Sequence, residues 1–174
     1  LLCDDEVLDT VTVTYGYRSF RVCPNTGFWL NGKNVPLHGV SRHQDRLDKG
    51  WAISKADHEE DIALIKELGA NTIRLAHYQH DQYFYSLCDK TGFILWAEIP
   101  FISQFIPTEE AYDNTISQMT ELVAQNYNHP AICFWGISNE ILIGPDREDL
   151  RQNLRDLHEL AKSMDPSRLT TMAQ

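Results

Sequence analysis

The chain has 174 residues, of which 43% are hydrophobic and 10% aromatic, enough to bury the core of about one domain. Its formal net charge of -10 disfavours nucleic acid and anionic membrane surfaces as partners, because both are negatively charged themselves. No apolar run approaches the roughly 20 residues that span a bilayer. Small ligands, neutral or cationic, remain as expected partners.

The N-terminal part of the chain has the pattern of a β-structure. Residues 4–22 alternate apolar and polar side chains, which is typical of a strand with one buried face. The first ten residues, "LLCDDEVLDT", contain no methionine and no signal-peptide pattern, which indicates an excerpt of a longer chain. Further on, Asn31-Gly32 predicts a two-residue hairpin turn between "FWL" and "VPLHGV". We therefore expect this part to be the end of an all-β domain, followed by a hairpin.

From Val35 onward, short apolar runs alternate with segments of helical period. The first helix is expected to begin after Ser54 as N-cap and to end at Gly69, with Ile62, Ile65 and Leu68 on one face. Alternation of strands and helices predicts parallel strands covered by helices. The pattern gives five strands, at 36–40, 71–77, 93–100, 131–140 and 168–173, and four helices, at 54–69, 81–92, 108–127 and 147–165.

Two architectures fit this alternation, an open doubly wound sheet and a (β/α)8 barrel. The open sheet normally carries a glycine-rich first turn, which is absent here. A barrel instead collects active groups from the ends of several strands. We therefore predict an α/β fold, a partial (β/α)8 TIM barrel of about five strands. Polar residues recur at four predicted strand ends: His38 and His43, Arg74 and His77, Glu98, Asn139 and Glu140.

The stretch "FWGISNE" leads from an apolar strand directly to Asn139 and Glu140. Such a strand would hold a carboxyl group beside an amide at the rim of the barrel, an arrangement suited to cleaving a glycosidic bond. The alternative is that Glu140 only starts a loop or caps a helix. Arg74 likewise has two readings, an ion pair with Glu98 or Glu140 and direct ligand contact.

Four motifs carry a family resemblance: "GVSRHQD", "NTIRLAHYQHDQYFYSLCDKTGFILWAEIP", "NHP" and "WGISNE". In this order and spacing they resemble the first half of the catalytic barrel of glycoside hydrolase family 2, most of all its β-galactosidases. Residues 26–174 would form this part of the barrel. Residues 1–25 resemble the end of the immunoglobulin-like domain that precedes it, with a linker.

The resemblance implies a retaining β-glycosidase that hydrolyses terminal β-galactosides, with Glu140 as general acid/base. Asn139 would hydrogen-bond the 2-hydroxyl of the sugar. The family's nucleophile is expected beyond Gln174, so we expect the chain alone to be inactive; Glu98 is the less favoured substitute. The alternatives are β-glucuronidase, β-mannosidase and a noncatalytic carbohydrate-binding fragment. Four more residues would line the sugar site, the last of them as a weaker candidate: Arg74, His77, His43 and Asp45.

No cofactor is implied, and "AEIPFISQF" lacks the metal-binding glutamate and histidine of some family members. A metal-dependent barrel enzyme using His38, His43, Asp45 and His77 is a minor alternative. Trp51 is expected to be exposed, whereas Trp96 and Trp135 would pack in the core, as would Cys88 and Cys133. Open barrel edges predict self-association. The sequence leaves the compartment open, cytoplasmic or periplasmic/secreted.

Overall fold

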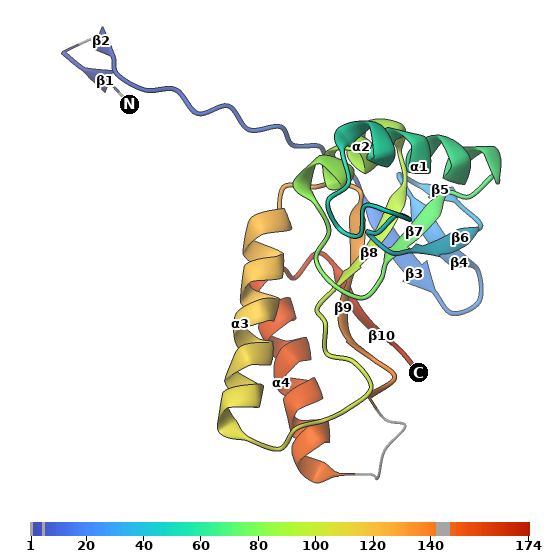
Figure 1. Cartoon of the computed structure of the whole chain (residues 1–174), viewed down its shortest axis with the longest axis vertical. Helices are drawn as coiled ribbons and strands as arrows, with labels where there is room; N and C mark the ends of the chain where they lie inside the picture. Colours follow the sequence, from blue (N-terminus) through green and yellow to red (C-terminus); the bar gives the residue numbers. More distant parts are fainter. Residues whose placement is uncertain (1, 5, 142–146) are drawn as a thin grey trace.

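A five-stranded parallel sheet lies at the centre of the computed structural model, which describes residues 2–4, 6–141 and 147–174 (Figure 1). Each strand pairs with the next one along the chain. A doubly wound sheet would reverse its strand order at a switch point, so the continuous order indicates part of a barrel, as predicted. The strands are β6 (Gly39–Arg42), β7 (Thr72–Leu75), β8 (Ile94–Glu98), β9 (Ile132–Asn139) and β10 (Leu169–Ala173).

Four helices connect these strands, with bounds close to those predicted. Ser54 caps the first helix in a reciprocal pair of hydrogen bonds with Asp57. Gly92 ends the second helix in the left-handed conformation, with φ of 78°, which glycine adopts without a steric penalty. The helices are α1 (Lys55–Glu67), α2 (Gln82–Thr91), α3 (Glu109–Asn126) and α4 (Glu148–Met164).

The two faces of the sheet differ in character, because successive side chains of a strand point to opposite faces. One face packs against the helices through buried apolar residues and forms the main core; it includes Ile73, Leu75, Leu95, Ala97 and Trp135. Arg74, Trp96 and Glu98 alternate with these residues and lie on the other face. The strands therefore join a continuous core on one side to polar groups on the other.

A three-stranded antiparallel sheet covers the amino ends of the central strands. It contains β3 (Phe20–Cys23), β4 (Gly27–Leu30) and β5 (Lys33–Asn34). The predicted hairpin turn is confirmed, since Asn31 and Gly32 have φ values of 49° and 77° between β4 and β5. Phe20 and Phe28 pack on Phe134 of β9, with ring centroids 6.3 and 5.9 Å from it. These aromatic contacts form a second, smaller core.

The prediction of one strand over residues 4–22 is wrong in its middle. Two short strands, β1 (Leu2–Cys3) and β2 (Glu6–Val7), pair with each other at the end of a tail that extends away from the body (Figure 1). Residues 8–19 have no strand partner, and Val11 and Tyr17 are exposed. An alternating pattern forms a stable strand only where a neighbouring strand and a core accept it. The assignment of residues 1–25 to an immunoglobulin-like domain stays a prediction.

The first strand of the barrel also begins later than predicted. β6 starts at Gly39, which pairs with Thr72, whereas residues 36–40 were expected to be extended. His38 therefore lies at the amino end of β6, where its carbonyl accepts hydrogen bonds from the Asn71 and Thr72 amides. Its predicted place at a carboxyl end is wrong. Leu68 is also exposed rather than on the buried face of α1.

Two further expectations concern membranes and thiols. Among the described residues, no helix has both the length and the apolar character to cross a membrane. Cys88 and Cys133 are buried as predicted. Burial raises the pKa of both thiols, that of Cys133 to about 11, which suppresses thiolate reactivity. Self-association through the edge strands β6 and β10 stays a prediction.

Candidate active site

Arg74 is the centre of a polar cluster at the carboxyl ends of β7, β8 and β9. Its guanidinium donates to both oxygens of Glu98, with Nε–Oε2 of 3.1 Å and Nη2–Oε1 of 2.9 Å. Glu98 is fully buried, and the Arg74 guanidinium also lies 4.6 Å from the Trp96 ring. The ion-pair reading of Arg74 is therefore confirmed. Because Arg74 engages both oxygens of Glu98, this carboxylate is poorly placed to act as a nucleophile.

Two more side chains complete this group, the Arg74 cluster of Arg74, His77, Glu98 and Asn139. Asn139 Oδ1 accepts a hydrogen bond from Arg74 Nη2 at 2.5 Å. His77 Nδ1 lies 3.0 Å from Arg74 Nη2 and 3.1 Å from Glu98 Oε1. His43 packs edge-on against His77, with ring centroids 4.9 Å apart. The fold thus brings together four residues that the sequence placed at three strand ends, together with His43 from a fourth.

Glu140 directly follows β9 and is exposed. Its φ of 53° lies in the left-handed region, which costs a non-glycine residue about 1 kcal/mol and is often found at functional sites. Three backbone hydrogen bonds of 2.9 Å hold this position: Asn139 N to Phe101 O, Ser103 N to Asn139 O, and Glu140 N to Ala173 O. Neighbouring backbone on both sides therefore fixes the point at which Glu140 leaves the strand.

The Glu140 carboxylate makes no hydrogen bond or ion pair with other residues that the structure describes. Glu140 thus differs from the buried and fully paired Glu98. An exposed, unpaired carboxyl group on a fixed backbone is available to a ligand. Asp45, the other acidic candidate, is also exposed, and no described contact joins it to the Arg74 cluster.

The side chains around Arg74 have room because residue 136 of β9 is a glycine. A Cβ at this position would lie 2.3 Å from Glu98 Cβ and 2.3 Å from Trp96 Nε1. We expect Gly136→Ala to displace Glu98 from Arg74 and to lower the free energy of unfolding by about 1–3 kcal/mol. Gly39→Ala is the matched control, because its nearest contact would be an ordinary 3.5 Å. Equal urea midpoints for the two variants would contradict this close approach.

A second polar cluster, missed in the sequence, lies around Arg42 at the end of β6. The Arg42 cluster consists of Arg42, His58, Asp61 and His80. Arg42 donates to Asp61 Oδ2 from Nε at 2.9 Å and from Nη2 at 2.7 Å. Its Nη1 and Nη2 lie 3.0 Å from Nδ1 of His80 and Nδ1 of His58. Since a guanidinium can only donate hydrogen bonds, the Nδ1 atoms of both histidines act as acceptors. A ring nitrogen that accepts carries no proton, so both imidazoles are neutral.

His80 connects this second cluster to the loop that carries His77. Its Nε2 lies 3.1 Å from the Ala76 carbonyl and, with Nδ1 accepting, donates to it. Ala76 is joined to His77 by a cis peptide bond, and the Ala76 amide donates to Arg42 O at 3.0 Å. Arg42, at the end of β6, therefore holds Ala76 in two ways. Its backbone carbonyl binds the Ala76 amide, and its side chain binds His80, which binds the Ala76 carbonyl.

The buried histidines give the fold a pH-dependent stability. Burial lowers the pKa of His80 to about 3, and the charge of Arg42 acts in the same direction. The pKa of His80 is lower in the folded protein than the value of about 6.5 in the unfolded chain. The neutral His80 therefore contributes its full stability above about pH 6.5, and this contribution declines as the pH falls toward 3. We expect His80 alone to reduce the free energy of unfolding by about 2 kcal/mol between pH 7 and pH 5.

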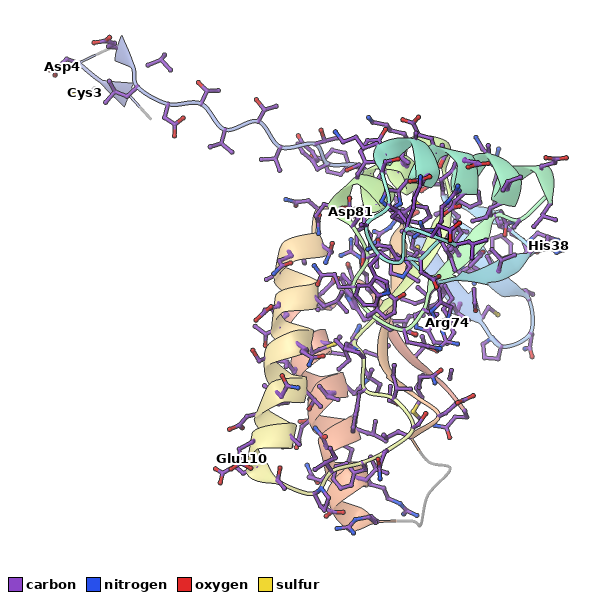
Figure 2. The ribbon with its side chains drawn as sticks, viewed as in Figure 1. Cys3, Asp4, His38, Arg74, Asp81 and Glu110 are labelled. Atoms are coloured by element: carbon purple, nitrogen blue, oxygen red, sulfur yellow. The ribbon has the colours of Figure 1, made fainter. Side chains whose placement is uncertain are left out.

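Urea denaturation at pH 7 and pH 5 measures this effect. Burial also lowers the pKa of His58, so a smaller decline should remain after His80→Gln. His38→Gln is the control, because His38 is exposed and lies at the other end of β6. Figure 2 shows His38 at the outer edge of the molecule and Arg74 nearer its middle. The same pH dependence in the His80→Gln variant and the unsubstituted protein would contradict this account.

The candidate metal ligands are not assembled. Within the described ranges, no group of three or more His, Cys, Asp or Glu side chains is placed to hold a metal ion. His38 is separated from His43 by the length of β6, because it precedes the strand that His43 follows. The minor alternative that joined His38, His43, Asp45 and His77 therefore has no geometric support among these residues.

Comparison with known proteins gives consistent matches. A family model described as "Glycosyl hydrolases family 2, TIM barrel domain" matches residues 23–174. A β-glucuronidase of Bacteroides fragilis is 45% identical over 177 residues, covering 98% of this chain and 25% of the relative. A β-galactosidase of Thermoanaerobacterium thermosulfurigenes is 30% identical over 157 residues, covering 90% of this chain and 21% of that relative. The chain thus spans a quarter or less of the length of these relatives.

Solved structures agree with the fold. An FMN-binding β-glucuronidase from Facaelibacterium prausnitzii L2-6 is 57% identical, with a TM-score of 0.89. The match covers 91% of this chain and 25% of the chain of that structure. A putative β-galactosidase from Bacteroides fragilis is 40% identical, with a TM-score of 0.92. This match covers 98% of this chain and 25% of the chain of that structure. The family model, which covers most of the chain, and these structures lead to one conclusion. The chain belongs to glycoside hydrolase family 2 and contains the N-terminal part of its TIM barrel domain.

Proposed function

We propose that the protein is a retaining β-glycosidase in which Glu140 is the general acid/base. The observation that supports this role is the exposed Glu140 on a fixed backbone, unpaired among the residues that the structure describes and next to Asn139 of the Arg74 cluster. Glu140 would protonate the glycosidic oxygen and later take a proton from the attacking water. A second carboxylate is required as nucleophile, and Glu98 is unsuitable because Arg74 binds both its oxygens.

The residues around Glu140 suit the binding of a sugar ring. Asn139 offers its amide nitrogen to a hydroxyl while its oxygen stays fixed by Arg74. His77 and His43 are not fully buried and lie edge to face, so their free ring atoms are available to further hydroxyls. These roles for Asn139, His77 and His43, with Arg74 as the group that orients Asn139 and His77, are part of the proposal.

β-Glucuronides are the first candidate substrates, because the relative with 45% identity and the structure with 57% identity are β-glucuronidases. β-Galactosides, which the sequence motifs favoured, are the second candidate, supported by the relatives with that activity in their names. The specificity is thus proposed from relatives, whereas the reaction type is proposed from the site.

The test uses the purified full-length gene product and paired 4-nitrophenyl β-D-glucuronide and β-D-galactoside substrates. We expect hydrolysis of at least one, with a higher kcat/KM for the glucuronide. Proton NMR of the first-formed product should show the β-anomer, as a retaining mechanism requires. Hydrolysis with inversion, or no hydrolysis of any β-glycoside, would reject the proposed mechanism.

A further inference from the structure

A groove with a volume of about 380 Å³ adjoins the Arg74 cluster. We call it the Trp51 groove; its lining includes Trp51, Tyr78, Gln79, Glu98, Gln118 and Glu121. Glu98 belongs both to this lining and to the Arg74 cluster, so the groove and the cluster share one residue and are neighbours. A molecule attached to a sugar at the candidate active site would therefore find the groove directly beside it.

Trp51 and Tyr78 form a flat aromatic wall. Their rings stack with centroids 4.5 Å apart and an interplanar angle of 29°. The Tyr78 hydroxyl accepts a hydrogen bond from the backbone amide of Gln44 at 3.1 Å, which fixes the Tyr78 ring. Trp51 nevertheless remains 63% exposed. A large aromatic surface that is held in place but left uncovered is typical of a binding surface.

The polar residues of the groove indicate which ligand would cover this wall. Gln79 lines the groove and donates its side-chain amide to Gln125 Oε1 at 2.6 Å, so its own oxygen is left to accept. Gln118 supplies both a donor and an acceptor, and Glu121 an acceptor. The Glu121 charge disfavours an anionic group inside this groove. A neutral sugar fits, because it combines an apolar C–H face with hydroxyl groups.

We propose that the Trp51 groove binds a neutral sugar residue on the leaving-group side of the bond that is cleaved. This inference rests on the proposed function, because it assigns the groove to the same substrate. The pyranose ring stacks on Trp51, and its hydroxyls reach Gln79 and Gln118. Trp51 then acts on the affinity for long substrates and not on the chemical step.

Two substrates separate these effects in the full-length gene product. One is a β-linked disaccharide with glucose at its reducing end, and the other is the β-glycosyl fluoride of the same terminal sugar, which leaves the groove empty. We expect Trp51→Ala to lower kcat/KM for the disaccharide about 10-fold, the size of a lost aromatic stack, and to leave the fluoride unchanged. Trp51→Phe should restore most of the loss. Leu47→Ala, exposed in the same loop and outside the groove, is the control.

Equal losses with both substrates, or no loss with either, would overturn the inference. Calorimetric titration of cellobiose into Glu140→Gln protein, with and without Trp51→Ala, tests the groove without turnover. We expect binding about 10-fold weaker without Trp51. Trp51-dependent binding in a protein that cleaves no glycoside would reject the proposed function and keep the groove as a saccharide site. Absence of cellobiose binding to the protein that retains Trp51 would reject the groove.

Discussion

Replacement of Glu140 by glutamine should lower kcat for a glycoside with a poor leaving group by about 10²–10⁴-fold. The amide keeps the size of the side chain but has no acidic proton to give to the glycosidic oxygen. The loss in kcat/KM should be much smaller with a dinitrophenyl leaving group, which departs without protonation, whereas a loss in kcat should persist because the attacking water still lacks its base. Steady-state kinetics on an alkyl and a dinitrophenyl glycoside of the same sugar measure the difference.

A chemical rescue makes this expectation specific to general acid/base catalysis. Azide needs no base to activate it, so we expect added azide to accelerate Glu140→Gln and to give a β-glycosyl azide. Glu110→Gln is the control, since Glu110 is an exposed carboxylate on the first turn of α3 (Figure 2). Equal losses with both leaving groups and no effect of azide would show that Glu140 has another role.

Much of the candidate site could be predicted because it follows from the direction of the strands. Arg74, Glu98 and Asn139 lie at the ends of three apolar runs, and parallel strands place such ends at one edge. The observed contacts among these side chains confirm that prediction. The backbone bonds around Glu140 could not be predicted, because they depend on loop residues after β8 and on β10.

The missed features have a common physical cause, the dependence on distant partners. Arg42 lies 16 and 38 residues from His58 and His80, and no local pattern reports such pairings. His38 was placed at the wrong end of its strand because the start of β6 is set by pairing with β7 rather than by local apolar content. Residues 8–19 show the same limit, since their alternating pattern has no partner strand.

The largest loss of stability is expected from Arg168→Leu, at the opposite end of the strands from the candidate site. Arg168 is buried and donates to Asp165 Oδ2 at 2.6 Å and to the carbonyls of Ile132, Tyr127 and His129 at 2.8, 2.9 and 2.8 Å. It thereby ties the start of β10 to the start of β9. Removing it would leave Asp165 buried and charged without its ion-pair partner, which costs about 3–5 kcal/mol.

Asp165 is held in its charged form by the same network. Burial raises the pKa of this carboxyl, but hydrogen bonds from Ser167, Arg168 and Trp135 outweigh burial and hold the pKa at about 2. Because this value is below the unfolded pKa of about 3.9, the contribution of Asp165 to stability is present above about pH 4 and is lost as the pH falls toward 2. The cost of Arg168→Leu should therefore be largest near neutral pH.

Urea denaturation at pH 7 measures this cost, with Arg147→Leu as the matched control. Arg147 pairs with Asp149 at the same distance of 2.6 Å, but their side chains are 44% and 47% exposed. We expect a change of less than about 1 kcal/mol for this exposed pair. Adding Asp165→Leu to Arg168→Leu should recover part of the lost stability, because the unpaired charge is then removed. Similar losses for the buried and the exposed arginine would contradict the assigned role.

Arg74 and Arg168 also differ in what their loss should do to the enzyme. Arg74 is partly exposed and contacts Asn139 beside Glu140, so Arg74→Leu should affect KM and kcat as well as stability. Arg168 is separated from Glu140 by the length of β9, so the folded fraction of Arg168→Leu should keep the KM of the unsubstituted protein. A changed KM in Arg168→Leu would show that the amino ends of the strands also determine the geometry of the site.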